Sequence, residues 1–246
     1  MTTFTIHKLD ATTSTNEVLK NAVANEQLKA PTLLWAEYQF EGKGQLTKSW
    51  QSNAGQNLTF SVFWPEIKLS SIAHFRINIL VCLALIEVFE FYQIPDLRIK
   101  WPNDILSDRS KVAGILIENL VKGQNIQSTV VGVGININQL DFEGLPQAGS
   151  FALSTGKQFD REEVLHTIQL RLHKTFSRLH QEDSNQELER FNQLLFGRGH
   201  WCKFLYKGVE QMGKIVGLDT LGSLQIEWEN ELVESFHDTA QIKMLY

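Results

Sequence analysis

Apolar residues recur along the chain in short runs with the period of strands and in longer runs with the period of helices. Strands are expected where Val, Ile, Leu and aromatic residues form short runs between turn residues. The pattern predicts strands at residues 4–8, 32–38, 58–63, 97–101, 112–120 and 129–137. The last run is nearly continuous in apolar residues, which is typical of a central strand.

Helical spacing separates these runs. Ser14 and Glu17 have the spacing of a capping box, and the apolar residues after them favour a helix that begins there. Residues 72–92 are largely apolar, which indicates a helix buried against the sheet rather than laid on a surface. Further helices are expected at residues 160–180 and 186–196, and a loop at residues 138–155.

The character of the chain changes after the last predicted helix. Only short strand-like pieces follow, with alternation of apolar and polar residues clearest at Leu224, Ile226 and Trp228. This pattern favours a small β-barrel of the SH3 type. We therefore expect an α+β fold with two domains. Residues 1–198 form a mixed β-sheet domain with helices largely on one face, and residues 199–246 form a C-terminal SH3-like barrel.

Composition and charge narrow the class of protein. The 246 residues are 43% hydrophobic and carry a net charge of −5, which suits a globular enzyme and argues against a general nucleic-acid binder. Cys82 and Cys202 are far apart, so neither a zinc site nor a disulfide framework is indicated, and a reducing cytoplasm is expected. The N-terminus lacks a secretory signal pattern, and the longest apolar run, residues 79–86, is far shorter than the ~20 residues that cross a bilayer. We expect no membrane contact.

The segment from Lys100 to Asp104 carries the most informative chemistry. Lys100 ends a predicted strand, Asp104 follows after a turn, and Lys111 stands just before the next strand. Pro102 cannot donate to a β-ladder, so the polar residues cluster at the strand terminus. Gly114 lets another group approach the backbone closely. Two cations and a carboxylate in an uncharged neighbourhood are suited to activating a carboxylate with ATP.

Four segments stand in a recognisable order along the chain. They are Ser14-Thr15-Asn16, Gln39 with Gly42-Lys43-Gly44-Gln45, Lys100-Trp101-Pro102-Asn103-Asp104 with Lys111-Val112-Ala113-Gly114, and Gly132-Val133-Gly134-Ile135-Asn136. Each alone is a weak signal, but together they resemble the biotin protein ligases over nearly the whole chain. The resemblance implies that family's mixed-sheet catalytic domain. It also implies a monofunctional type, because a first strand near residue 4 leaves no room for a DNA-binding helix-turn-helix.

The resemblance implies a role for each of these positions. Lys111 is the expected catalytic residue, since its family counterpart bridges the biotin carboxylate and the α-phosphate. Asp104 is the expected ligand for Mg²⁺. The residues expected to contact biotin are Ser14, Thr15, Asn16, Gln39, Lys43, Gly44, Gln45, Lys111, Gly114 and Gly134. Those expected to contact ATP are Lys43, Lys48, Lys100, Asn103, Lys111 and Asn136.

Simpler interpretations exist for several of these segments. Residues 14–16 are suited to capping a helix, and residues 42–44 to forming a solvated turn. Asn136 can satisfy backbone groups of a buried strand, and Lys111 can be a surface lysine. The loop does not have P-loop spacing, and residues 132–134 lack the third glycine of a dinucleotide fold.

The glycine-containing loop also departs from the family pattern. Lys43 and Gln45 stand where arginines are usual, and Thr47 stands where glycine is usual. Gln45 is the larger change, because an amide keeps hydrogen bonds but not charge.

The implied function is ATP-dependent biotinylation. Biotin and ATP give biotinyl-5′-AMP and pyrophosphate, and a lysine of a biotin carboxyl carrier domain then attacks the activated carbonyl. One alternative is a lipoate ligase, which shares the fold but needs a long apolar tunnel. Another is a protein that holds biotin or its adenylate without transferring it. A homodimer paired through an exposed sheet edge stays open, and no DNA partner is expected.

Overall fold

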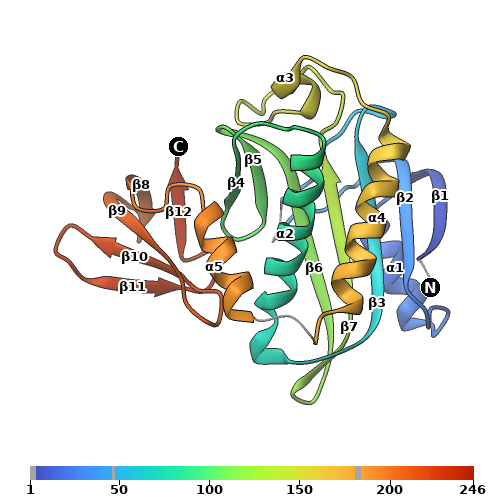
Figure 1. Cartoon of the computed structure of the whole chain (residues 1–246), viewed down its shortest axis with the longest axis horizontal. Helices are drawn as coiled ribbons and strands as arrows, with labels where there is room; N and C mark the ends of the chain where they lie inside the picture. Colours follow the sequence, from blue (N-terminus) through green and yellow to red (C-terminus); the bar gives the residue numbers. More distant parts are fainter. Residues whose placement is uncertain (1–3, 46–47, 181–183) are drawn as a thin grey trace.

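The molecule is built around one large β-sheet (Figure 1). The computed structural model describes residues 4–45, 48–180 and 184–246. Within these ranges the sheet has seven strands in the order β1-β2-β3-β7-β6-β5-β4. β1 runs parallel to β2 and the other neighbours are antiparallel, so the sheet is mixed. The strands are β1 (Thr5–Thr12), β2 (Thr32–Gln39), β3 (Leu58–Ser70), β4 (Leu97–Lys100), β5 (Asp104–Ser107), β6 (Ser110–Lys122) and β7 (Asn125–Ile135).

The strands expected from the sequence are all present, and the differences lie mainly at their ends. β3 continues to Ser70, and its pairing with β7 shifts register between Pro65 and Leu69. The proline and this irregularity interrupt the apolar pattern, which made the strand look shorter. β5 was not predicted, because it has four residues and directly follows the turn at Pro102. β7 is central, as its apolar run predicted.

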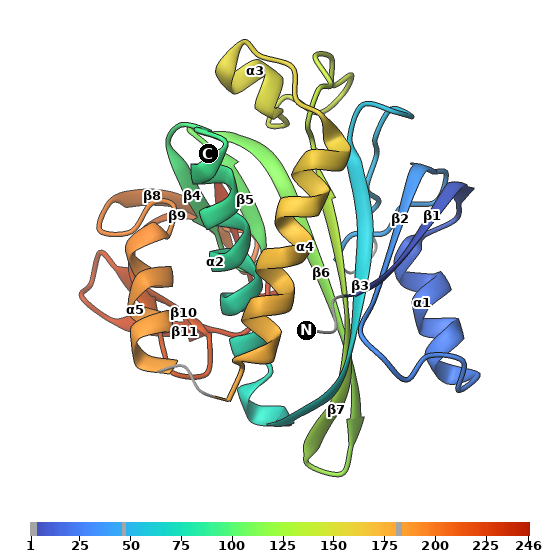
Figure 2. The same cartoon turned by 45° about the vertical axis from the view of Figure 1, so that its right-hand side comes forward.

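Helices cover the two faces of the sheet unequally. α2 and α4 lie on one face, with α5 packed against α2 beside β4 (Figure 1). α1 lies on the opposite face, against β2, β3 and β7 (Figure 2). The helical elements are α1 (Thr15–Ala24), the 3₁₀ turn η1 (Ser71–Ala73), α2 (Phe75–Phe91), α3 (Phe151–Thr155), α4 (Arg161–Ser177) and α5 (Ser184–Leu194). α3 is a short helix within the segment expected to be a loop.

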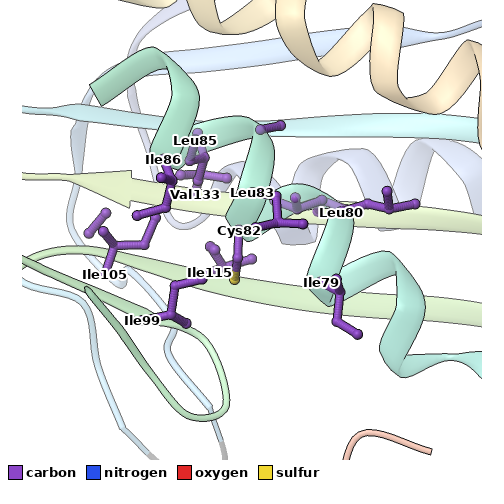
Figure 3. Packing of buried hydrophobic residues seen from close by; sticks show 14 of the residues in the cluster. Ile79, Leu80, Cys82, Leu83, Leu85, Ile86, Ile99, Ile105, Ile115 and Val133 are labelled. Carbon is purple, nitrogen blue, oxygen red and sulfur yellow. The ribbon is translucent and has the colours of Figure 1, made fainter. Parts of the chain in front are cut away.

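The centre of the hydrophobic core is α2. Its residues are buried on nearly every side, because the sheet lies beneath it and α4 and α5 lie beside it. Figure 3 shows Cys82 and Ile86 of α2 beside Ile99, Ile105 and Ile115 of β4, β5 and β6. The η1–α2 segment is long and apolar enough to cross a membrane, but most of it is buried inside the protein. The predicted burial of this helix against the sheet is confirmed.

A second, smaller sheet follows α5. Its five antiparallel strands have the order β11-β10-β9-β8-β12 within the described ranges. They are β8 (Trp201–Tyr206), β9 (Val209–Leu218), β10 (Leu224–Trp228), β11 (Val233–Phe236) and β12 (Ile242–Leu245). Leu224, Ile226 and Trp228 are buried while the residues between them are partly exposed, which confirms the predicted alternation. The indole N–H of Trp101 donates to the carbonyl oxygen of Gly222 at 3.0 Å and ties this sheet to the end of β4.

Candidate active site

A cavity of about 350 Å³ lies where the large sheet, the start of α1, residues 43–45 and 48–50, and β12 meet. Its wall contains every predicted site residue except Asn136. The fold therefore brings together side chains from segments that are far apart in the sequence. Their assignment to particular ligands stays a prediction.

Lys111 and Asp104 form an ion pair in this wall. The Nζ of Lys111 lies 2.6 Å from the Oδ1 of Asp104, and both side chains are partly buried. Asp104 begins β5 directly after the turn, and Asn103 in that turn donates its side-chain amide to the carbonyl oxygen of Ile115 on β6. The turn is thereby fixed to the neighbouring strand.

An irregularity in β6 places Lys111 on the same face of the sheet as Asp104. Asp104 is opposite Gly114 and Ile105 is opposite Ala113, but the next residue of β5 is opposite Lys111, so Val112 has no partner in β5. Because side chains alternate along a regular strand, one extra residue changes the face to which the following side chain points. Val112 is fully buried, whereas Lys111 reaches the cavity.

Lys100 provides a second cation beside Asp104, since the two residues pair across β4 and β5. Burial lowers the pKa of Lys100 below its ordinary value. Asp104 opposes this shift, and nearby ammonium groups add to it, namely those of Lys111, Lys48 and Lys243. Among the described residues, no carboxylate lies within ion-pair distance of Lys100. Such a group of cations favours the binding of an anion.

Hydrogen bonds at the start of α1 fix the opposite wall. The backbone N–H of Thr15 donates to the Oε1 of Gln39 at 2.7 Å, and the Thr15 hydroxyl lies 2.7 Å from the Ser61 hydroxyl. Ser61 in turn donates to the Oδ1 of Asn16 at 2.5 Å, and the Nδ2 of Asn16 donates to Glu118 at 2.9 Å. Both ends of the Asn16 amide are thus engaged within the protein. The Gln39 side chain points its Oε1 at Thr15, and its amide nitrogen lies beside Gly42.

The capping box predicted at the start of α1 does not form. Ser14 occupies the N-cap position in extended conformation, but its side chain makes no capping hydrogen bond. Glu17 instead binds two lysines, with its Oε1 3.0 Å from the Nζ of Lys43 and 3.1 Å from that of Lys20. These charged hydrogen bonds, the one from Lys43 first, lower the pKa of Glu17 below its ordinary value. Two cations compete successfully for a carboxylate that would otherwise reach back to a backbone N–H.

The glycine-containing loop folds back on itself and contacts α1. The N–H of Gly44 donates to the carbonyl oxygen of Lys48, and the N–H of Trp50 donates to that of Gly42, each at 2.8 Å. A side chain at Gly42 would approach the Trp50 carbonyl oxygen to 2.5 Å, so this close approach requires glycine. Lys43 anchors the loop through its ion pair with Glu17. The departure at Thr47 lies outside the described residues.

Trp50 lies directly against the small residues of the sheet. A side chain at Gly134 would overlap the Trp50 ring, and one at Gly114 would lie 3.1 Å from it. The Nζ of Lys111 is 5.5 Å from the centroid of the same ring. The indole nitrogen of Trp50 is buried and has no hydrogen-bond partner among the described residues. The indole of Trp50 thus lies against both glycines, and their expected contact with biotin stays a prediction.

Asn136 lies behind Lys111 rather than in the cavity wall. Its Nδ2 donates to the carbonyl oxygen of Gly149 at 2.8 Å and to that of Lys111 at 3.3 Å. Its backbone N–H donates to the carbonyl oxygen of Val112 at 2.8 Å. In this position Asn136 holds the backbone around Lys111, as the simpler interpretation of a buried strand asparagine proposed. Its expected contact with ATP stays a prediction.

Sequence reasoning did not find several residues of the wall. Lys243, Met244 and Thr239 come from the second sheet and reach the cavity beside Lys100. Each belongs to a short strand or turn with no motif, and more than 130 positions separate it from Lys100. Trp50 follows the glycine-containing loop and belongs to none of the four segments. Proximity in the fold, rather than any local pattern, assigns these residues to the site.

Comparison with known proteins identifies relatives of this arrangement. Residues 9–136 match the model of the biotin/lipoate A/B protein ligase family. The chain is 33% identical over 168 residues to the biotin–[acetyl-CoA-carboxylase] ligase of Paracoccus denitrificans, covering 65% of this chain and 68% of that protein. It is 31% identical over 168 residues to the bifunctional ligase/repressor BirA of Bacillus spizizenii, covering 66% of this chain. The match spans 51%, about half, of that relative's length.

Solved structures share the whole fold. The biotin protein ligase from Aquifex aeolicus, in complex with biotin and ATP, is similar with a TM-score of 0.82 and 26% identity, and the match covers 98% of both chains. That match includes the second sheet, which the family model does not reach. Since the family model covers just over half of the chain, the protein belongs to the biotin/lipoate A/B protein ligase family.

Proposed function

We propose that this protein is an ATP-dependent biotin protein ligase. It forms biotinyl-5′-AMP and transfers biotin to a lysine of a biotin carboxyl carrier domain of a biotin-dependent carboxylase. The observation that carries the proposal is the cavity in which Lys100, Asp104 and Lys111 face the hydrogen-bonding start of α1. The names of the relatives, and the biotin and ATP in the Aquifex neighbour, support the same reaction.

The start of α1 is suited to the ureido ring of biotin. The first N–H groups of a helix lack partners within the helix and can donate to a carbonyl oxygen. Ser14 has a buried side chain that makes no capping bond, so its hydroxyl is available to a ligand. Thr15 and Gln39 hold each other in place, and the amide nitrogen of Gln39 is available as a donor. Asn16 supports this wall of the cavity through its side-chain amide, which is hydrogen-bonded to Ser61 and Glu118.

The cations of the opposite wall are suited to the carboxylate and the phosphates. Attack of a carboxylate on ATP brings two anions together, and positive groups must cancel their repulsion. We assign this role to Lys111, between the biotin carboxylate and the α-phosphate, with Lys100 beside it. Lys43 and Lys48 add positive charge from the loop, and Gly44 and Gln45 line the cavity there without charge. Binding of the anions requires Lys111 to exchange its contact with Asp104 for contacts with the substrate.

Asp104 fits the ion that ATP chemistry requires. Mg²⁺ usually binds through one or two carboxylates together with phosphate oxygens and water. A single partly buried carboxylate beside a cationic cavity matches this donor set. Bound there, the ion would neutralise phosphate charge. Once Lys111 turns toward the substrate, the carboxylate of Asp104 would be available to bind Mg²⁺.

The alternative within the same family is lipoate ligation. Lipoate has no ureido group, and its ring needs an apolar tunnel rather than donors. The buried polar residues Ser14, Thr15 and Asn16, with Gln39, favour biotin. A protein that only holds the adenylate is the remaining alternative. The intact set of Lys100, Asp104 and Lys111 supports full catalysis instead.

One assay separates the three functions. The protein is incubated with labelled biotin or labelled lipoate, Mg²⁺-ATP and a biotin carboxyl carrier domain, and the label bound to denatured carrier is counted. We expect biotin on the carrier in amounts stoichiometric with AMP. A carrier whose acceptor lysine is replaced by arginine is the control. Preferential transfer of lipoate, or formation of adenylate with no transfer, would contradict the proposal.

The organisation of the chain completes the proposal. Residues 1–198 form the catalytic domain and residues 199–246 an SH3-like barrel, supported by the change of sheet after α5.

The exposed edge strand β1 provides a surface through which two subunits could pair into a homodimer. The free thiols of Cys82 and Cys202 suit a cytoplasmic location. Sedimentation of the purified protein tests the dimer directly.

A further inference from the structure

Tyr246 covers the ammonium group of Lys100. The Nζ of Lys100 lies 4.4 Å from the centroid of the Tyr246 ring. The ring is held edge-on by Phe196, at a centroid distance of 5.2 Å and an interplanar angle of 63°. Phe196 itself donates its N–H to the carbonyl oxygen of Ile99, the residue before Lys100. The aromatic pair is therefore anchored to the strand that carries Lys100.

The backbone of Tyr246 is also linked to Lys111. The Nε2 of Gln147 donates to the backbone oxygen of Tyr246 at 2.7 Å. The N–H of Lys111 donates to the carbonyl oxygen of Gln147 at 2.7 Å. The N–H of Gly149 donates to the carbonyl oxygen of Lys111 at 2.9 Å. One residue thus connects Tyr246 to the strand start from which Lys111 projects.

Lys100 needs this support because its surroundings disfavour a charged group. It is partly buried, it lies near the ammonium groups of Lys111 and Lys243, and the described residues offer it no ion pair. The face of an aromatic ring attracts an ammonium ion and restricts where it can lie. The Tyr246 ring can therefore keep the Lys100 side chain extended toward the cavity.

We propose that Tyr246 is a positioning residue for the nucleotide half of the site. This proposal rests on the proposed function, in which Lys100 binds ATP. The ring orients Lys100, and the backbone oxygen of Tyr246 steadies Lys111 through Gln147. β12, which ends one residue before Tyr246, pairs with β8 in the second sheet. The second sheet thereby contributes to the chemistry of the first by placing one aromatic residue.

Two substitutions at Tyr246 separate the ring from the rest of the residue. Tyr246→Leu removes the ring face, and Tyr246→Phe keeps it. Titration with a non-hydrolysable ATP analogue and Mg²⁺ should show affinity about tenfold weaker for the leucine variant. The phenylalanine variant should stay within about twofold of the wild type. Biotin affinity should be unchanged in both variants, because Tyr246 contacts neither Ser14 nor Gln39.

Trp201→Leu provides a matched control. It removes another aromatic ring near a lysine on the same sheet, since the Nζ of Lys214 lies 5.7 Å from the Trp201 ring centroid. Trp201 is exposed and does not line the cavity. Nucleotide affinity should therefore stay at the wild-type value. Thermal unfolding of each variant shows whether it is folded at the temperature of the titration.

A double-mutant cycle connects the effect to Lys100. In a Lys100→Met background, Tyr246→Leu should weaken nucleotide binding no further. Equal losses in both backgrounds, or a loss in Tyr246→Phe as large as in Tyr246→Leu, would overturn the inference. Failure of the proposed function looks different. A wild-type protein that binds nucleotide but transfers no biotin would refute biotinylation while the Tyr246 comparison stayed valid.

Discussion

Lys111 and Asp104 are bound to each other across the cavity wall, with 2.6 Å between the Nζ and the Oδ1. The ion pair joins the residue proposed to act on the carboxylate and the residue proposed to hold Mg²⁺. Each charge satisfies the other in a partly buried place, where an unpaired charge would be unfavourable. With these proposed roles, substrate and metal ion would replace this contact together.

Replacing Lys111 with alanine should abolish adenylate formation. The variant lacks the cation proposed to lie between two anions, and loss of such a contact can raise the barrier by about 3 kcal/mol, or slow the reaction about a hundredfold. Biotin-dependent exchange of label between ATP and pyrophosphate measures this step. Circular dichroism verifies the fold. Near-normal exchange in a folded variant would remove Lys111 from the mechanism.

Replacing Asp104 with asparagine should weaken the use of Mg²⁺-ATP far more than the binding of biotin. The amide cannot supply the negative charge that Mg²⁺ prefers. It also releases Lys111 from its ion pair, so biotin affinity should be retained or increased. Calorimetric titration with biotin and a magnesium dependence of the rate measure the two effects. A large loss of biotin affinity with unchanged magnesium dependence would contradict the assignment.

Replacing Gln45 with arginine should slow the release of biotinyl-AMP. Gln45 lines the cavity without a charge, whereas a guanidinium can pair bidentately with phosphate. The slower dissociation should shrink at high salt. Rapid mixing of the preformed complex with excess biotin measures the off-rate. Equal or faster release from the variant would mean that Lys43 or Lys48 already supplies the charge.

Replacing Gly134 with alanine should displace Trp50. The added methyl group would overlap the indole ring, and overpacking of this kind costs about 1–3 kcal/mol of unfolding free energy. The same substitution in a Trp50→Ala background should be much less destabilising, because the overlapping ring is gone. Urea unfolding of the four proteins measures the difference. An equal loss in both backgrounds would mean that Trp50 does not occupy this place in solution.

Replacing Glu17 with glutamine should lower stability at neutral pH but not in acid. The pKa of Glu17 in the folded protein lies below the ordinary value of 4.5, with the hydrogen bond from Lys43 as the largest cause. A depressed pKa stabilises the fold above the pKa of the unfolded chain, and this contribution is lost as the pH falls through the folded pKa.

The size of this effect is small because Glu17 is partly exposed. We expect about 0.5–1 kcal/mol at pH 7 and a smaller difference at an acidic pH below 4.5. Urea unfolding of wild type and Glu17→Gln at both pH values gives the difference. Lys43→Met should remove part of the same contribution to the free energy of unfolding. A difference that grows as the pH falls would show that the ion pair with Lys43 does not stabilise the fold.

Burial made the large elements predictable from the sequence. The apolar run that became α2 could be satisfied only inside the protein, and β7 showed the continuous apolar character of a central strand. β5 escaped because four residues after a turn carry too little pattern. The capping box between Ser14 and Glu17 failed because the rule considers neighbours along the chain, whereas Lys43 reaches Glu17 through space.

The candidate site was predictable only where its residues stand in motifs. Lys100, Asp104 and Lys111 occur within a few positions of one another, and the cavity brings them together. Tyr246 and Lys243 meet Lys100 from the other end of the chain, so no local pattern indicates them. Motifs identify the groups on the large sheet. Only the packing of the two sheets identifies the residues near the C-terminus that support those groups.

The unpaired residue Val112 makes the location of the Lys111 ammonium depend on the number of residues in a strand. Deleting one position here would leave the sheet, its apolar layers and the charged residues of the neighbouring strands in place. Strand alternation would nevertheless turn the lysine toward the helices that cover the other face. A ligase could then become a stable protein with the right composition and no activity. For this fold, the alignment of residues 111–114 without gaps is as informative as the identity of the lysine itself.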